Sequence, residues 1–341
     1  MISASPTLSI VAPCHNEELV LDEFLRRVNA VCLSSAPSCE IVLIDDGSTD
    51  ATWPRMLQLA SQNPNIVCIK LSRNHGHQLA LSAGLAVCTG QRILIIDADL
   101  QDPPELLPEM MRLMDQGNDV VYGQRRQRLG ENILKRSTAS LFYRLINRLA
   151  ERPIPLDTGD FRLISRRALD ILNAMPERHR FIRGMISWIG FKQTPLLYDR
   201  DPRFAGITHY SFAKMLRLAI DGVTALSIKP LQVASWIGVC TGVLAIALVI
   251  YSVIGWLTGN VQAGWTSLMA AIAFLSSVQL FVLGILGEYL GRLYEQSKGR
   301  PLYVIEQIVR PDSPPVDPPL STATVRERPP ATVPVGSPPS T

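Results

Sequence analysis

The stretch Ile93-Leu94-Ile95-Ile96-Asp97-Ala98-Asp99 joins four consecutive apolar residues to two carboxylates. A short apolar run without polar alternation is typical of a strand buried on both faces of a parallel sheet. Carboxylates two residues apart at the end of such a strand offer hard oxygen ligands to Mg²⁺ or Mn²⁺ if the chain turns there. The same spacing occurs in many solvated turns, so the interpretation of Asp97 and Asp99 depends on the rest of the chain.

Similar apolar runs recur through the first half of the chain, at residues 8–12, 41–44 and 66–69. Stretches with helical spacing lie between them, at residues 19–33, 51–60 and 78–87. Alternation of strand and helix predicts an α/β fold with a Rossmann-like, mostly parallel sheet. Ligands bind beyond the carboxyl ends of the strands in such sheets, and the acidic clusters of this chain follow predicted strands.

A long uncharged block lies between Lys229 and Glu288, where no Asp, Glu, Lys or Arg occurs although such residues make up 18% of the chain. Its two apolar stretches, residues 231–257 and 265–287, each exceed the ~20 residues that a helix needs to cross a bilayer. The sequence therefore predicts a transmembrane hairpin of two helices after the α/β domain. The net charge of +3 is too small to indicate a nucleic-acid partner.

The N-terminus and the cysteine pattern bear on the cellular compartment that we expect for the protein. The N-terminus lacks the basic flank of a signal peptide. Six cysteines without a C-x-x-C pair argue against a disulfide framework and a thiolate zinc site.

The basic residues lie on both sides of the hairpin and not in the loop that connects its helices. By the positive-inside rule, we therefore expect an inner-membrane protein with two spans and with the catalytic domain and both termini in the cytoplasm. The basic residues on the two sides of the hairpin are Lys214, Arg217, Lys229, Arg292, Lys298 and Arg300.

These features divide the chain into five expected regions. The segment 211–230 is an amphipathic helix that lies at the membrane interface or packs on the soluble domain. The proline-rich composition of the C-terminal tail predicts disorder. The expected regions are a catalytic domain over 1–210, the interfacial helix 211–230, the hairpin 231–290, a cytoplasmic juxtamembrane segment 291–310 and the tail 311–341.

Four motifs in this order resemble those of inverting family 2 glycosyltransferases of GT-A fold. They are Val11-Ala12-Pro13-Cys14-His15-Asn16-Glu17-Glu18, Asp45-Asp46-Gly47-Ser48-Thr49-Asp50, Arg73-Asn74-His75-Gly76-His77-Gln78 and Asp97-Ala98-Asp99-Leu100-Gln101-Asp102-Pro103-Pro104-Glu105. With the hairpin, the resemblance covers about residues 8 to 306 and is nearest to the polyprenyl-phosphate branch, which includes bactoprenol glucosyltransferases and dolichol-phosphate mannose synthases.

The resemblance implies a role for each matching residue. Asp97 and Asp99 would bind Mg²⁺ or Mn²⁺ and the donor diphosphate, with Gln101 assisting and Ala98 between them. Asp160 would be the catalytic carboxylate, with Asp157 as the alternative. The residues expected around the nucleotide base and ribose are Pro13, Asn16, Glu17, Asp45 and Asp46, and those expected to face phosphate are Arg125 and Arg203. Because His75 and His77 lack a nearby third ligand, a positioning or packing role is favoured for them over metal binding.

The implied reaction moves a hexose to undecaprenyl or another polyprenyl phosphate for cell-envelope glycan modification, and we expect the hexose to be glucose from UDP-glucose. A processive polysaccharide synthase is a competing interpretation, but it would need more spans and a Q-x-x-R-W motif. A second competing interpretation is a non-catalytic scaffold that binds sugar nucleotides in the membrane. The complete acidic motifs argue against this interpretation. Small residues at Gly238, Gly242 and Ala245 would allow hairpins to pack together in a homo-oligomer.

Overall fold

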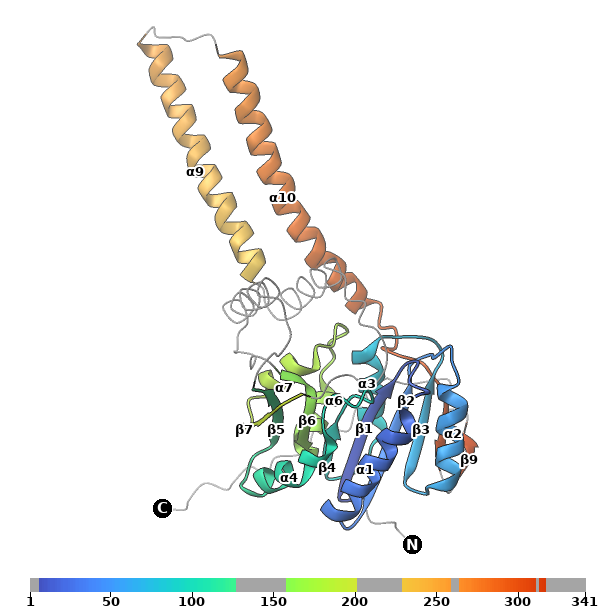
Figure 1. Cartoon of the computed structure of the whole chain (residues 1–341). Helices are drawn as coiled ribbons and strands as arrows, with labels where there is room; N and C mark the ends of the chain where they lie inside the picture. Colours follow the sequence, from blue (N-terminus) through green and yellow to red (C-terminus); the bar gives the residue numbers. More distant parts are fainter. Residues whose placement is uncertain (1–5, 127–157, 201–228, 259–263, 311–312, 317–341) are drawn as a thin grey trace, which may run out of the picture.

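The computed structural model describes residues 6–126, 158–200, 229–258, 264–310 and 313–316. It contains an α/β domain from which two long helices project (Figure 1). The expected interfacial helix is outside the described residues, except for its last two positions. Two expected site residues, Asp157 and Arg203, also lie outside them.

The domain is built on a nine-stranded sheet with the order β7-β5-β6-β4-β1-β2-β3-β8-β9. Strands β1 to β4 are mutually parallel, which confirms the predicted Rossmann-like core and brings their carboxyl ends to one edge. β5 and β7 are parallel to each other, whereas β6, β8 and β9 are antiparallel to their neighbours. The strands are β1 Leu8–Cys14, β2 Cys39–Asp45, β3 Ile66–Leu71, β4 Arg92–Ile95, β5 Val120–Arg125, β6 Thr158–Ser165, β7 Gln193–Tyr198, β8 Ile305–Arg310 and β9 Ser313–Val316.

Helices cover both faces of this sheet. Adjacent strand residues such as Ile10 and Val11 are fully buried in different apolar clusters, one on each face. This two-sided burial explains why the strands carry continuous apolar runs. The helices on one face are α1 Leu21–Ser35, α2 Thr52–Gln62 and α4 Leu107–Asp115, which follows the 3₁₀ turn Pro104–Leu106; those on the other are α3 His77–Val87, α6 Arg166–Ala174 and α7 Ile182–Ile189.

The antiparallel strand β6 brings a distant part of the chain to the ligand edge. Its residue Arg162 pairs with Ile95 of β4. Asp160 lies two residues before Arg162, and Asp97 lies two residues after Ile95. Because the two strands run in opposite directions, both carboxylates reach the same level at the end of β4.

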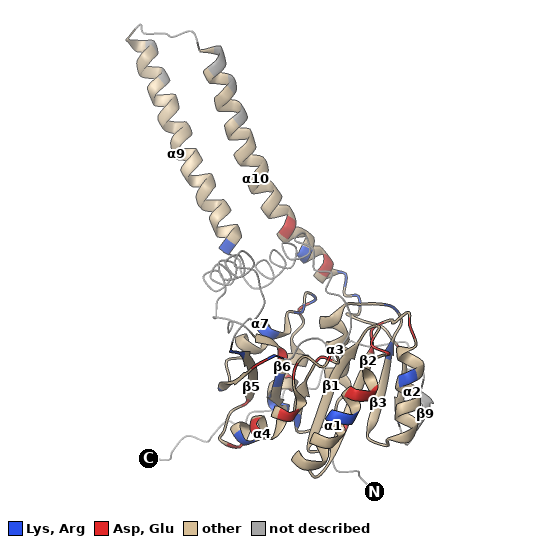
Figure 2. Ribbon diagram, in the orientation of Figure 1, with Lys and Arg blue, Asp and Glu red and all other residues tan. Residues whose placement is uncertain are grey.

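The predicted hairpin is present as α9, Lys229–Leu257, and α10, Trp265–Ser297. Both are long and apolar enough to cross a membrane, and Figure 2 shows charge only at their ends near the α/β domain. α10 continues beyond the predicted end of its apolar stretch at residue 287. Its polar end carries an ion pair between Glu288 and Arg292, whose oxygen and nitrogen lie 2.9 Å apart.

After the hairpin the chain returns to the sheet. β8 pairs antiparallel with β3, so residues 305–310 of the expected juxtamembrane segment belong to the α/β domain. β9 extends this edge, which corrects the prediction that the whole of 311–341 is disordered. A proline-rich composition does not prevent a segment from forming a strand when a neighbouring strand such as β8 is there to pair with it. The prolines of β9 are tolerated because one side of an edge strand makes no hydrogen bonds to another strand.

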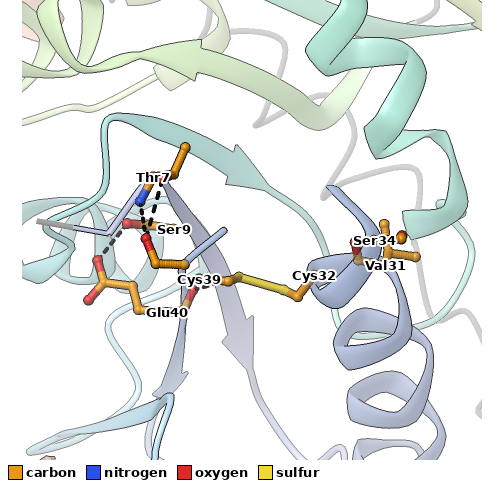
Figure 3. The surroundings of a disulfide bond; sticks show 8 residues. Thr7, Ser9, Val31, Cys32, Ser34, Cys39 and Glu40 are labelled. Atoms are coloured by element: carbon orange, nitrogen blue, oxygen red, sulfur yellow. Dashed lines mark hydrogen bonds between the residues drawn. A yellow bond between two sulfur atoms is a disulfide. The ribbon is translucent and has the colours of Figure 1, made fainter. Parts of the chain in front are cut away.

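One disulfide joins Cys32, in the last turns of α1, to Cys39, the first residue of β2 (Figure 3). The cysteine spacing argued against a disulfide framework, and this pair is the one disulfide among the six cysteines. The short connection between helix and strand brings the two Cα atoms to 6.1 Å, a separation that a disulfide spans. The other four cysteines are free.

Candidate active site

The loops that follow β1 and β2 are tied together at the expected nucleotide-binding edge. Asn16 adopts a left-handed backbone (φ 58°), which Asn tolerates better than most residues. Its side-chain Oδ1 accepts a hydrogen bond from the Thr49 N–H at 2.8 Å, and the Glu17 N–H donates to Thr52 Oγ1 at 2.8 Å. Pro13 is buried within β1 beside Ile44. The loops after β1 and β2 are therefore held together along one edge of the sheet.

The carboxylate of Asp46 holds a third loop against this edge. Its Oδ1 accepts from the His75 N–H at 2.7 Å, and its Oδ2 accepts from the Gly76 N–H at 2.9 Å. Asp45 is also buried, and its Oδ1 accepts from the Ser48 N–H at 3.1 Å. Both aspartates lie at the carboxyl end of β2, and the hydrogen bonds described for their carboxylates come from main-chain N–H groups. Asp46 thus fixes the position of the loop at residues 75–76.

Gly47 provides a stability test of this arrangement. It has φ +63°, and an added Cβ would lie 2.4 Å from the Asn74 backbone nitrogen. We expect Gly47→Ala to lower the free energy of unfolding by about 2–5 kcal/mol, from backbone strain together with the clash. Thermal unfolding of the purified protein measures this change. The control is Gly117→Ala, where φ is +83° but nothing lies within 4 Å, and an equal loss in both variants would contradict the proposed contact.

Two carboxylates meet one imidazole at the end of β4. His77 Nε2 lies 3.1 Å from Asp160 Oδ2 and 3.5 Å from Asp97 Oδ1. Asp160 is 3% exposed, whereas the Asp97 side chain is 29% exposed. This contact agrees with the positioning role favoured for His77 and brings the proposed metal ligand Asp97 close to the proposed catalytic carboxylate.

The charges in this cluster are set by burial and by each other. Burial would lower the pKa of His77, but its hydrogen bond to Asp160 and the neighbouring carboxylates raise that pKa to about 9. Burial raises the pKa of Asp97 to about 6, with His77 opposing the shift and nearby carboxylates adding to it. Burial would also raise the pKa of Asp160, but Arg183 and His77 hold it well below its usual range. At neutral pH, His77 is therefore a cation between two carboxylates.

Asp160 is oriented by two residues that the sequence did not mark as functional. Arg183 on α7 donates from Nε to Asp160 Oδ1 at 2.7 Å, and Gln78 donates from Nε2 to Asp160 Oδ2 at 2.9 Å. Arg162, two residues after Asp160 on β6, is buried and donates to the Gly159 carbonyl at 2.9 Å. A single arginine in the otherwise apolar segment Phe181-Ile182-Arg183-Gly184-Met185 was the available signal for Arg183.

A second group of charges lies around Asp99 and Asp102. Arg200 Nη2 is 3.9 Å from Asp99 Oδ2, and Arg200 Nε is 3.3 Å from Asp102 Oδ1. Arg125, the last residue of β5, reaches the same region. The position that a Cβ on Gly159 would take lies 3.2 Å from Arg125 Nη2 and 3.8 Å from Asp102 Oδ2, so both side chains border Gly159. Arg125 therefore lies near Asp102, and its contact with phosphate stays a prediction, while Arg200 is a nearby cation that the motifs did not identify.

The donor set at the end of β4 fits a divalent cation bound together with a phosphate ligand. Asp97 Oδ1 is buried without a hydrogen-bond partner, and Asp99 Oδ1 accepts from the Gln101 N–H at 3.1 Å. Among the described residues no three His, Cys, Asp or Glu side chains form a complete metal site. Mg²⁺ commonly takes one or two carboxylates and completes its shell with water and substrate phosphates, so two carboxylates would be enough for such a site. Ala98 between them is buried.

Comparison with known proteins gives two family matches on this chain. Residues 9–172 match the family described as glycosyl transferase family 2, and residues 229–293 match the GtrB C-terminal hairpin. The glycosyltransferase YkcC of Bacillus subtilis is 42% identical over 302 residues, which is 88% of this chain and 93% of YkcC. The bactoprenol glucosyl transferase of Shigella phage SfV is 38% identical over 300 residues, or 88% and 98% of the two chains. Mannosyl-3-phosphoglycerate synthase from Rubrobacter xylanophilus is a solved structure similar to this one, with a TM-score of 0.44 and 20% identity over 64% of this chain and 72% of that chain.

Proposed function

The chain belongs to glycosyl transferase family 2, and from that membership we propose that it transfers a hexose from a nucleotide sugar to a polyprenyl phosphate. The observation that carries the proposal is the pair Asp97 and Asp160, which lie on either side of His77 at the edge of the sheet. The adjoining hairpin, which matches that of GtrB, supports a lipid acceptor. Bactoprenol is the acceptor lipid in the names of several relatives.

The donor half of the site would hold the nucleotide diphosphate. Asp97 and Asp99, with Gln101 nearby, would bind Mg²⁺ or Mn²⁺, which neutralises the charge that develops on the leaving diphosphate. Pro13, Asn16 and Glu17 lie on the edge that would face the base and ribose. Asp45 and Asp46 support that edge through their main-chain hydrogen bonds.

The acceptor half of the site explains the proposed role of Asp160. A lipid monophosphate with a second pKa near ~6 is largely dianionic at pH 7, so its oxygen needs little deprotonation before it attacks. The new bond forms between that oxygen and the anomeric carbon, while the bond to the diphosphate breaks on the opposite face and inverts the configuration. Because its pKa is held so low, Asp160 would stabilise positive charge at the sugar or orient the acceptor rather than act as a strong base. Arg125 and Arg203 would contact phosphate.

Undecaprenyl phosphate is the acceptor we propose and UDP-glucose the donor. The glucosyl transferases among the relatives support glucose. Purified protein incubated with undecaprenyl phosphate and radiolabelled UDP-glucose should form a labelled lipid, and EDTA should abolish its formation. A panel of other UDP- and GDP-sugars tests the choice of sugar. Polymer without lipid-linked monosaccharide would instead indicate a processive synthase, and nucleotide binding without any transfer would indicate a scaffold.

The fold supports a single membrane side for both ends of the hairpin. β1 to β7 precede the hairpin and β8 follows it, yet all belong to one sheet. The segments on either side of α9 and α10 must therefore return to the same α/β domain. Together with the basic flanks, this supports a cytoplasmic catalytic domain and a two-span anchor in the inner membrane.

Replacing residues 231–294 with a flexible Gly/Ser linker tests the anchor while keeping β8 on the sheet. We expect donor binding to persist but transfer to undecaprenyl phosphate in bilayers to fall about 100-fold, because the enzyme loses its high effective concentration at the lipid. Transfer to a short, water-soluble prenyl phosphate serves as the control and should change much less. Full activity of the linker variant on bilayer substrate would contradict the anchoring role.

A further inference from the structure

The polar end of α10 is fastened to the loop between α6 and α7. The Gln296 carboxamide accepts from the Arg178 N–H at 3.1 Å and donates to the Pro176 carbonyl at 2.7 Å. The third hydrogen bond runs from the loop to the segment after α10, where Arg178 Nη1 donates to the Arg300 carbonyl at 2.7 Å. We call these three hydrogen bonds the α10 clasp.

The clasp fixes geometry more than it adds stability. The Arg178 guanidinium is 3.8 Å from Glu295 Oε2, and an ion pair of this length near the surface contributes little. Each hydrogen bond of the clasp uses at least one main-chain group, so together they set where the loop backbone lies. Arg180 independently pins the loop to α6 by donating from Nη2 to the Leu172 carbonyl at 2.7 Å. Loss of the clasp should therefore shift the loop without unfolding it.

The same loop leads directly into the residues that orient Asp160. The Ile182 N–H, at the start of α7, donates to Gln78 Oε1 at 3.0 Å, and Gln78 in turn donates to Asp160. The next residue, Arg183, donates to Asp160 and also, from Nη1, to the Thr158 carbonyl at 3.1 Å. Two of the three groups that contact the Asp160 carboxylate, Gln78 and Arg183, therefore depend on where α7 begins, and His77 is the third.

We propose that the α10 clasp is a positioning device that couples the membrane hairpin to Asp160 through Arg183. The hairpin then has a second role besides anchoring, since α10 sets the start of α7 and thereby the orientation of the carboxylate. Residues that hydrogen-bond to metal ligands and orient them commonly contribute 10-fold to 100-fold to activity, and we expect an effect at the lower end of this range for residues that orient Asp160. This inference rests on the proposed function, in which Asp160 acts at the sugar.

The first test is Gln296→Ala in the full chain, reconstituted with undecaprenyl phosphate and assayed with UDP-glucose. We expect kcat to fall about tenfold, with the KM for the nucleotide sugar and the thermal unfolding midpoint unchanged. The control is Lys298→Ala, since the Lys298 side chain pairs with Glu295 and stacks on Tyr294 within the same helix end. Its kcat should equal that of the wild type. A wild-type kcat for Gln296→Ala, or a fall in stability that matches the fall in kcat, would overturn the coupling.

A double-mutant cycle tests whether the clasp acts through Arg183. In an Arg183→Ala background, or Arg183→Lys if the first variant does not fold, Gln296→Ala should lower kcat by less than about twofold, because coupled residues are not additive. A full tenfold further loss would show that the clasp does not act through Arg183. If the wild-type protein forms no lipid-linked sugar, the proposed function fails; if it does and the cycle is additive, only this inference fails.

Discussion

Asp160→Asn should lower kcat for sugar transfer about 1,000-fold while leaving the KM for the nucleotide sugar nearly unchanged, at the upper end of the losses seen when one group that stabilises transition-state charge is removed. The substitution removes a buried negative charge that Arg183 and His77 align toward the reaction site. Donor binding should persist because Asp97 and Asp99 remain. Steady-state kinetics on undecaprenyl phosphate, with nucleotide binding measured separately, checks both expectations.

The pH dependence of this variant distinguishes charge stabilisation from general base catalysis. A carboxyl group whose pKa is held far below its usual range is ionised at every pH from 5 to 9. Its ionisation therefore produces no rising or falling limb in the pH–rate profile over this range. Because Asp160 raises the pKa of both His77 and Asp97, we expect the limbs of the Asp160→Asn pH–rate profile to move to lower pH, while none of them disappears and the maximal rate falls. Disappearance of a pH-dependent limb would indicate that Asp160 takes up a proton. Asp170→Asn, at an exposed aspartate on α6, is the control for the loss of a carboxylate.

The parallel core of the fold could be predicted because its information is local. Each of β1 to β4 is a continuous apolar run, and the two-sided burial of the sheet requires that pattern at every strand. The same argument placed Asp45, Asp46, Asp97 and Asp99 at one edge, because the carboxyl ends of parallel strands coincide. Periodicity thus brought the four carboxylates to one edge of the sheet without any knowledge of side-chain contacts.

The contacts within the site depend on pairings between distant parts of the chain, which no local pattern encodes. Asp160 meets Asp97 only because β6 inserts antiparallel beside β4. Arg183 reaches Asp160 from a helix whose single charge resembles an ordinary surface residue in the sequence. β8 was assigned to a juxtamembrane segment because of its position after the hairpin, whereas its partner β3 lies more than 200 residues earlier.

Asp97→Asn should abolish most of the metal-dependent activity, with kcat/KM falling about 1,000-fold. A bound cation supplies several kcal/mol of charge stabilisation to a leaving diphosphate, and each 1.36 kcal/mol corresponds to tenfold in rate. An amide at this position keeps the shape of the side chain but loses the charge. Titration with Mg²⁺ and Mn²⁺ in the presence of UDP should show weaker metal binding by Asp97→Asn than by the wild type. The control is Asp115→Asn, at an exposed position at the end of α4, which should bind metal as the wild type does.

The raised pKa of Asp97 adds a pH test to the same experiment. Because that pKa is about 6 without metal, protons compete with the cation below this value and Asp97 is ionised above it. Wild-type metal affinity should therefore fall as the pH decreases through 6 and level off toward pH 7. Asp97→Asn has no such proton to lose, so its weaker affinity should vary less over this range. Equal pH dependence in both proteins would mean that another group holds the metal, and Asp99 would then be the next residue to substitute.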